Sequence, residues 1–91
     1  MADIQVKRSH TLGKQQAREV AEQVAEKLKD RIQVKAHWDG DTLRFERKGA
    51  SGFIAVSDDA VDVEISLALM FKPMKGMIEG KVREYLDERL R

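Results

Sequence analysis

The fold is decided by the stretch Val61-Asp62-Val63-Glu64-Ile65-Ser66-Leu67-Ala68-Leu69. Apolar and polar side chains alternate along it, which is typical of a β-strand with one buried and one solvated face. The side chains expected to face the core are those of Val61, Val63, Ile65, Leu67 and Leu69. Because antiparallel sheets commonly leave one face in water, the stretch predicts such a sheet with its helices on one side only.

Weaker alternation in the rest of the chain predicts four more strands. Apolar residues alternate in the segments 34–38, 43–45 and 54–56, and again near the N-terminus at Ile4 and Val6. Turn-forming residues separate the later segments at positions 39–41, 48–50 and 57–59. Short loops between consecutive strands favour an antiparallel meander, in which the N-terminal strand pairs antiparallel with the last one.

Two segments carry helical spacing. Apolar residues recur every three or four positions from residue 12 to about residue 32, and Thr11 is the expected N-cap of this helix. A second helix is predicted to begin at Pro73, because proline suits a first helical turn, and to run nearly to Arg91.

Together these elements predict one α+β domain over residues 1–91, in the order β-α-β-β-β-β-α. We expect a five-stranded antiparallel sheet with two helices packed on one face. A curved sheet that holds a long C-terminal helix is similar to a trimmed helix-grip fold, and this analogy carries no function by itself. The side chains expected on the uncovered face are Gln5, Lys7, Lys35, His37, Arg44 and Glu64.

Composition argues against several classes of protein. The chain carries 17 basic and 16 acidic side chains and a net charge of +1, whereas nucleic-acid binders usually have a clear basic excess. It has no cysteine, so neither disulfides nor thiolate metal sites are available. Residues 1–10 contain no apolar signal-peptide core, and no window approaches the ~18 apolar residues of a membrane span. We therefore expect a cytoplasmic protein with no nucleic-acid partner and no membrane span.

Catalytic and metal-binding patterns are weak. Ser9, His10 and His37 are the candidates for nucleophile or base chemistry, and no third group is spaced to complete a triad. Solvent-exposed structural histidines are the favoured interpretation. The aspartates at 39–41 and 57–59 lack the remaining ligands of a calcium loop, and tight turns select aspartate in any case. We predict no enzyme activity, cofactor or metal, and we assign no residue to such a site.

Gly76 and Gly80 lie inside the second predicted helix, where each glycine costs about 1 kcal/mol relative to alanine. On a helical wheel both face away from the apolar side, so packing on the sheet does not explain them. They are candidates for a surface that a partner helix or a second copy of the chain approaches closely. The alternative is a glycine pair that a stable domain tolerates.

Flexible apolar side chains gather at one end of the predicted fold, in residues 67–71 and just beyond. Methionine-rich surfaces can serve adaptable apolar contacts. More often such a run closes the end of a core, and we favour that interpretation for the run as a whole. If part of it is exposed, the candidate apolar contact residues are Met70, Phe71, Met74 and Met77.

Several stretches, in matching order, resemble one family of small bacterial proteins, the polyhydroxyalkanoic acid system proteins, also described as polyhydroxyalkanoate granule regulatory or granule-associated proteins. The stretches are Ala2-Asp3-Ile4, Arg8-Ser9-His10-Thr11-Leu12-Gly13, Trp38-Asp39-Gly40-Asp41-Thr42-Leu43-Arg44-Phe45-Glu46-Arg47, Gly49-Ala50-Ser51-Gly52 and Lys72-Pro73-Met74-Lys75-Gly76-Met77-Ile78-Glu79. The resemblance implies a link to storage-polyester granules, and it brings no catalytic residue or ligand with it.

Three functional hypotheses follow. The first is a non-enzymatic accessory protein of polyhydroxyalkanoate metabolism that binds granules or granule proteins, and which self-associates if the outward glycines meet a second copy. The second is a carrier of a small apolar ligand, because helix-grip folds hold such ligands between sheet and helix. The third is an enzyme that uses His10, for which the sequence suggests no substrate.

Overall fold

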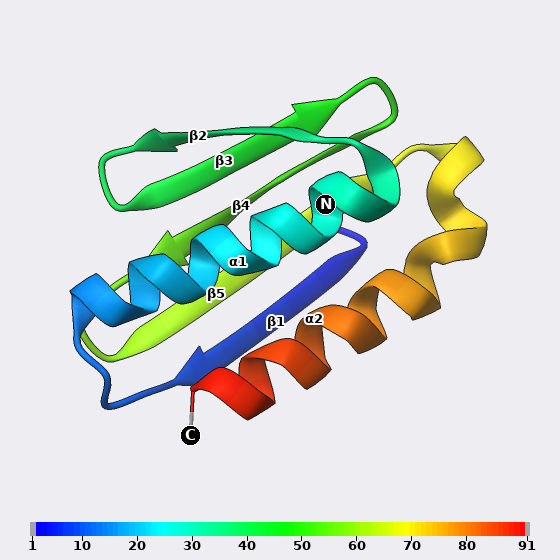
Figure 1. The fold of residues 1–91 in the computed structure, drawn as a ribbon. Helices are drawn as coiled ribbons and strands as arrows, with labels where there is room; N and C mark the ends of the chain where they lie inside the picture. Colours follow the sequence, from blue (N-terminus) through cyan, green and yellow to red (C-terminus); the bar gives the residue numbers. More distant parts are fainter. Residues whose placement is uncertain (1, 91) are drawn as a thin grey trace.

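The structure, a computed structural model, describes residues 2–90 and has the expected order of elements (Figure 1). A short 3-10 helix, η1, precedes the second α-helix. The elements are β1 (Ile4–Ser9), α1 (Lys14–Ile32), β2 (Lys35–Asp39), β3 (Thr42–Arg47), β4 (Ala50–Val56), β5 (Ala60–Leu67), η1 (Leu69–Met74) and α2 (Lys75–Arg89). The residue to which we expected the last helix to extend, Arg91, lies outside the described residues.

The five strands form one sheet in the order β1-β5-β4-β3-β2, and every neighbouring pair is antiparallel. The predicted meander and the pairing of the first strand with the last are confirmed. Ile4 lies opposite Ile65 in the pairing of β1 with β5, and Val63 lies opposite Ile54 in the pairing of β5 with β4. β1 and β2 are therefore the two edges of the sheet.

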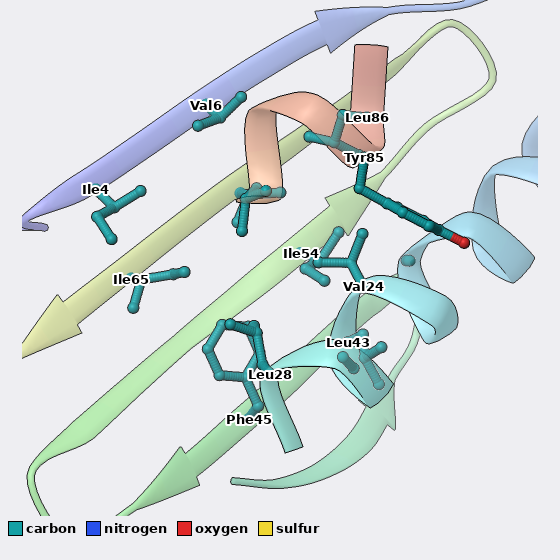
Figure 2. Close-up of a cluster of buried hydrophobic side chains, with 14 of the residues drawn as sticks. Ile4, Val6, Val24, Leu28, Leu43, Phe45, Ile54, Ile65, Tyr85 and Leu86 are labelled. Carbon is teal, nitrogen blue, oxygen red and sulfur yellow. The ribbon is translucent and has the colours of Figure 1, made fainter. Parts of the chain in front are cut away.

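Both helices cover the same face of the sheet, as predicted, and a single hydrophobic core lies between the two layers. Figure 2 shows Val24 and Leu28 of α1 and Leu86 of α2 directed toward the strand side chains beneath them. Three alanines of α1 are buried, so that helix lies close to the sheet; they are Ala17, Ala21 and Ala25. Between residues 2 and 90 neither helix is long and apolar enough to cross a membrane.

The opposite face of the sheet carries no covering element among the described residues. Gln5, Lys7, Lys35, His37 and Arg44 are exposed there, as expected from the alternation. Phe53 lies half-buried at the middle of this face, where β4 pairs it with Arg44 on one side and Glu64 on the other.

Three helix and strand boundaries differ from those predicted. α2 begins at Lys75 rather than at Pro73, which lies in η1. Gly13, with φ of 84°, occupies the N-cap position of α1, so the expectation of a Thr11 cap was wrong. β5 ends at Leu67, and the side chain of Leu69, which we expected in the core, is 83% exposed. At the end of the strand, Leu67 N–H donates to the Asp3 carboxylate and Ala68 N–H donates to the Gly49 carbonyl, and the chain then turns into η1.

Candidate functional site

Three large apolar side chains are exposed at one end of the molecule, and we call Leu69, Met70 and Met77 the apolar tip. Their exposed fractions are 83%, 64% and 41%. Leu69 and Met70 lie in η1, and Met77 lies in the first turn of α2. In Figure 1 this segment, drawn in yellow and gold, projects beyond the end of the sheet. The other large apolar side chains of residues 2–90 are buried or half-buried.

The turn between β3 and β4 holds η1 in place from one side. Ala68 N–H donates a 2.7 Å hydrogen bond to the Gly49 carbonyl oxygen. Gly49 has φ of 92°, and a Cβ there would lie 3.1 Å from both Met70 Sδ and Phe71 Cε2. Glycine therefore serves both the turn and the close approach of η1.

Phe71 and Met74 support the apolar tip from below. Phe71 is buried, with the guanidinium carbon of Arg47 4.8 Å from its ring centroid. Arg47 is itself fixed, because it donates to the carbonyl oxygens of Ile32 and Lys48. Met74 is half-buried and packs against the core. Of the four residues predicted to make an apolar contact, Met70 and Met77 are exposed, whereas Phe71 is a core residue and Met74 is partly one.

Asp3 holds η1 from the other side, and sequence reasoning missed it. Leu67 N–H donates a 2.7 Å hydrogen bond to Asp3 Oδ2, and the Lys72 ammonium donates to Asp3 Oδ1. The Leu67 hydrogen bond and, after it, the Lys72 partner hold the pKa of the Asp3 carboxyl below its ordinary value. No sequence pattern reveals this contact, because Asp3 and Leu67 are 64 residues apart.

We predict that this contact makes stability depend on pH. Since the folded-state pKa of Asp3 is depressed, its contribution is present above the ordinary value of 3.8 and is lost as the pH falls through the folded-state value. Asp3→Asn keeps an acceptor for Leu67 N–H but loses the charge. The wild type should be more stable than Asp3→Asn near neutral pH in denaturant unfolding, and the difference should shrink as the pH falls below 3.8. A difference that is constant with pH would contradict this.

Lysines border the apolar tip. Lys72 and Lys75 are exposed in η1 and at the start of α2, and both lower the pKa of Asp3 by their charge. An apolar patch with ammonium groups at its edge suits an apolar surface that carries acidic groups.

Gly76 and Gly80, the candidate close-approach residues, are exposed on α2 next to Met77. A Cβ at either position would meet no heavy atom within 4 Å. Packing within the described chain therefore requires neither glycine, and the outer surface of α2 is free for a close approach.

His10 is buried, which corrects the expectation that it is exposed to solvent: its exposed fraction is 5%. Leu12 N–H donates to His10 Nδ1 at 3.2 Å, and His10 Nε2 lies 3.2 Å from the Ser57 carbonyl oxygen. His10 N–H also donates to the Asp59 carbonyl oxygen. The ring therefore connects the loop between β1 and α1 to the turn between β4 and β5. His37, in contrast, is exposed on β2 as expected.

Turn aspartates are paired with basic side chains. Asp39 accepts from Arg44 at 3.2 Å, and Asp41 accepts from Lys14 and Arg18, each at 3.0 Å. The Lys14 hydrogen bond holds the pKa of the Asp41 carboxyl below its ordinary value. The described residues contain no group of His, Cys, Asp or Glu side chains placed to hold a metal.

A groove of about 590 Å³ lies between α1 and α2. Its floor is apolar, from Val24, Leu28, Ile78 and Val82, and charged side chains such as Lys27 form its rim. It is an open surface groove that borders Met77 of the apolar tip.

Comparison with known proteins identifies one family. The family described as "Putative polyhydroxyalkanoic acid system protein (PHA_gran_rgn)" matches residues 4–90. This range includes most of the stretches on which the sequence resemblance rested. No curated protein and no solved structure matches the chain.

Proposed function

This chain belongs to the polyhydroxyalkanoic acid system protein family, and we propose that it is a non-enzymatic accessory protein of bacterial polyhydroxyalkanoate storage-granule metabolism. It acts by binding granules or granule proteins. The observation that carries the proposal is the apolar tip, whose side chains remain exposed while the other large apolar side chains of residues 2–90 are buried or half-buried.

The apolar tip suits a surface without a fixed shape. Methionine side chains are flexible, so Met70 and Met77 can adapt to an irregular apolar surface such as a polyester. The backbone beneath them is held rigidly by Gly49 and Asp3. Binding therefore orders only a few side chains, which lowers its entropic cost.

The surroundings of His10 support a non-enzymatic role. A general base needs a ring nitrogen that can reach a substrate proton. His10 is buried, and its two ring nitrogens face the backbone groups of Leu12 and Ser57. The carrier hypothesis receives less support, because the groove between the helices is open and has a charged rim, whereas ligand pockets bury most of their ligand.

The test is co-sedimentation of the purified protein with polyhydroxyalkanoate granules across a salt series. Apolar contact should persist at high salt, which screens charge attraction. The tip variant carries Leu69→Gln and Met70→Gln. It therefore loses the partial burial of two apolar side chains against the granule. We expect this to cost about 2 kcal/mol and to weaken retention on the order of 30-fold.

Phe53→Gln is the matched control, because it removes an apolar side chain from the uncovered sheet face. Its retention should equal that of the wild type. Native granules and granules stripped of protein are compared: retention on native granules alone identifies a granule protein as the partner. Absence of retention on both, or a tip variant that is retained as well as the wild type, refutes contact through the apolar tip.

A further inference from the structure

β2 is an edge strand with a free hydrogen-bonding side. Among residues 2–90 it pairs only with β3, in continuous register from Lys35 with Glu46 to Asp39 with Thr42. A two-residue hairpin joins the two strands, so backbone groups of Asp39, His37 and Lys35 are directed toward β3. The N–H and C=O groups of Ala36 and Trp38 therefore point to the free edge. Neither a proline nor a bulge protects them.

The inner face of β2 is only partly covered. Ala36 lies opposite the buried Phe45, on the core side of the sheet, yet it is exposed. α1 packs over β3, β4 and β5, which leaves a hollow of about 780 Å³ between α1 and β2. Apolar side chains line this hollow on the strand side and charged ones on the α1 side: Val34, Ala36, Trp38 and Leu43 face Glu19, Glu22, Glu26 and Lys29. An apolar shelf next to a free strand edge is a place for another strand.

We propose that β2 pairs antiparallel with β2 of a second copy of the chain, about a two-fold axis at His37. This register places Lys35 of each copy opposite Asp39 of the other, so two ion pairs form on the outer face. It also places Ala36 of each copy opposite Trp38 of the other, so a small side chain meets a large one on the inner face. The pairing joins the two sheets into one and satisfies the edge groups of Ala36 and Trp38.

Only this register matches both faces. Side chains that lie opposite one another must share a face, so a two-fold axis at Ala36 or Trp38 is the nearest alternative. An axis at Ala36 places Lys35 opposite His37, and one at Trp38 places His37 opposite Asp39. Neither pairs Lys35 with Asp39, and neither pairs Ala36 with Trp38.

Trp38 is already fixed for this contact. Its Nε1 donates a 2.8 Å hydrogen bond to Glu22, and the guanidinium carbon of Arg18 lies 3.8 Å from its ring centroid. Arg18 is in turn bound to Asp41 and to the Gly40 carbonyl. Because the ring is held in the free chain, less side-chain freedom is lost when the second copy binds.

The pairing leaves the apolar tip accessible. A two-fold axis normal to the sheet reverses the strand direction of the second copy. The two tips then lie at opposite ends of the dimer, so one dimer touches two separate surfaces. Self-association is measured without granules, which separates this proposal from the proposed function.

Sedimentation velocity of the full chain over a concentration series tests the proposal. The wild type should form a species of twice the 10.4 kDa chain mass as its concentration rises. Ala36→Pro removes an edge N–H without removing one that β3 uses, and this variant should remain monomeric. In Lys35→Asp, the new aspartate of each copy lies opposite Asp39 of the other copy, so two repulsive pairs replace the two ion pairs. The affinity of the dimer should fall at least tenfold.

Adding Asp39→Lys to Lys35→Asp restores opposite charges, so the double variant should regain the dimer. Lys81→Asp, an equal change of charge on the exposed surface of α2, is the control and should dimerise as the wild type does. Circular dichroism verifies the fold of each variant. If Ala36→Pro unfolds, Lys35→Asp and the double variant still test whether β2 forms the dimer. A monomeric wild type, a dimer that Lys35→Asp leaves unchanged, or a double variant that stays monomeric would overturn the proposal.

Discussion

Gly52→Ala should destabilise the protein by about 3 kcal/mol, the upper end of the usual cost of overpacking a core. Gly52 lies in β4 between Phe45 and Ile65, on the face that the helices cover. A Cβ there would overlap the carbonyl oxygen of Glu64 and lie 2.8 Å from Phe45 Cζ and 3.0 Å from Ile65 Cα. Two of these three atoms belong to the backbone of β5, which cannot move without loss of strand pairing.

Denaturant unfolding measures this effect, and Gly76→Ala is its matched control. A Cβ at Gly76 meets nothing within 4 Å and the residue is helical, so the same chemical change there should stabilise by about 1 kcal/mol. Opposite signs for the two variants are the expected result. Phe45→Leu relieves only the ring contact, so it should restore little of the stability that Gly52→Ala removes. A nearly neutral Gly52→Ala would show that β4 and β5 can separate locally at no cost.

His10→Ala should also destabilise the protein by about 3 kcal/mol, because it removes a buried ring and leaves two partly buried backbone groups without partners. Leu12 N–H loses its acceptor, and the Ser57 carbonyl loses the ring nitrogen beside it. The loop between β1 and α1 depends on these bonds, since α1 has no side-chain cap at its N-terminus.

The two histidines of the chain provide the comparison. His37→Ala, at an exposed position, should change stability by less than about 0.5 kcal/mol in dilute solution. His10→Asn offers an amide oxygen near the position of Nδ1, so it should recover part of the loss by accepting from Leu12 N–H. Equal stability of His10→Ala and the wild type would mean that the loop does not need these bonds, and the case for a structural His10 would fail.

The spacing of apolar residues and the turn-forming residues between the strands were sufficient to predict most of the fold. The alternation from Val61 to Leu67 and the short turns before it define the sheet, because one buried face permits one register. Leu69 continues the same alternation, so local pattern alone extends the strand to it. The strand ends at Leu67, where Asp3 and Gly49, from distant parts of the chain, accept hydrogen bonds from Leu67 and Ala68 and the chain turns into η1.

The candidate site was predictable in composition but not in detail. Met70 and Phe71 are neighbours of similar hydrophobicity, yet one is exposed and the other buried. The difference arises from Arg47 and Gly49, which lie against the Phe71 ring and leave room for it. His10 was misjudged for a similar reason: the turn at Ser57 that covers it is 47 residues away. Contacts between distant residues determine both, and no local pattern encodes them.

The direction of α2 suggests that the domain could carry a fused protein on the surface of a particle. The helix starts beside the apolar tip at Lys75, and its 15 residues rise about 22 Å along the axis before Arg89. Its end lies away from η1 in Figure 1. If the apolar tip binds polyester as proposed, cargo fused beyond α2 would point outward from the particle, so enzymes or antigens could be arrayed on polyester beads without blocking the tip.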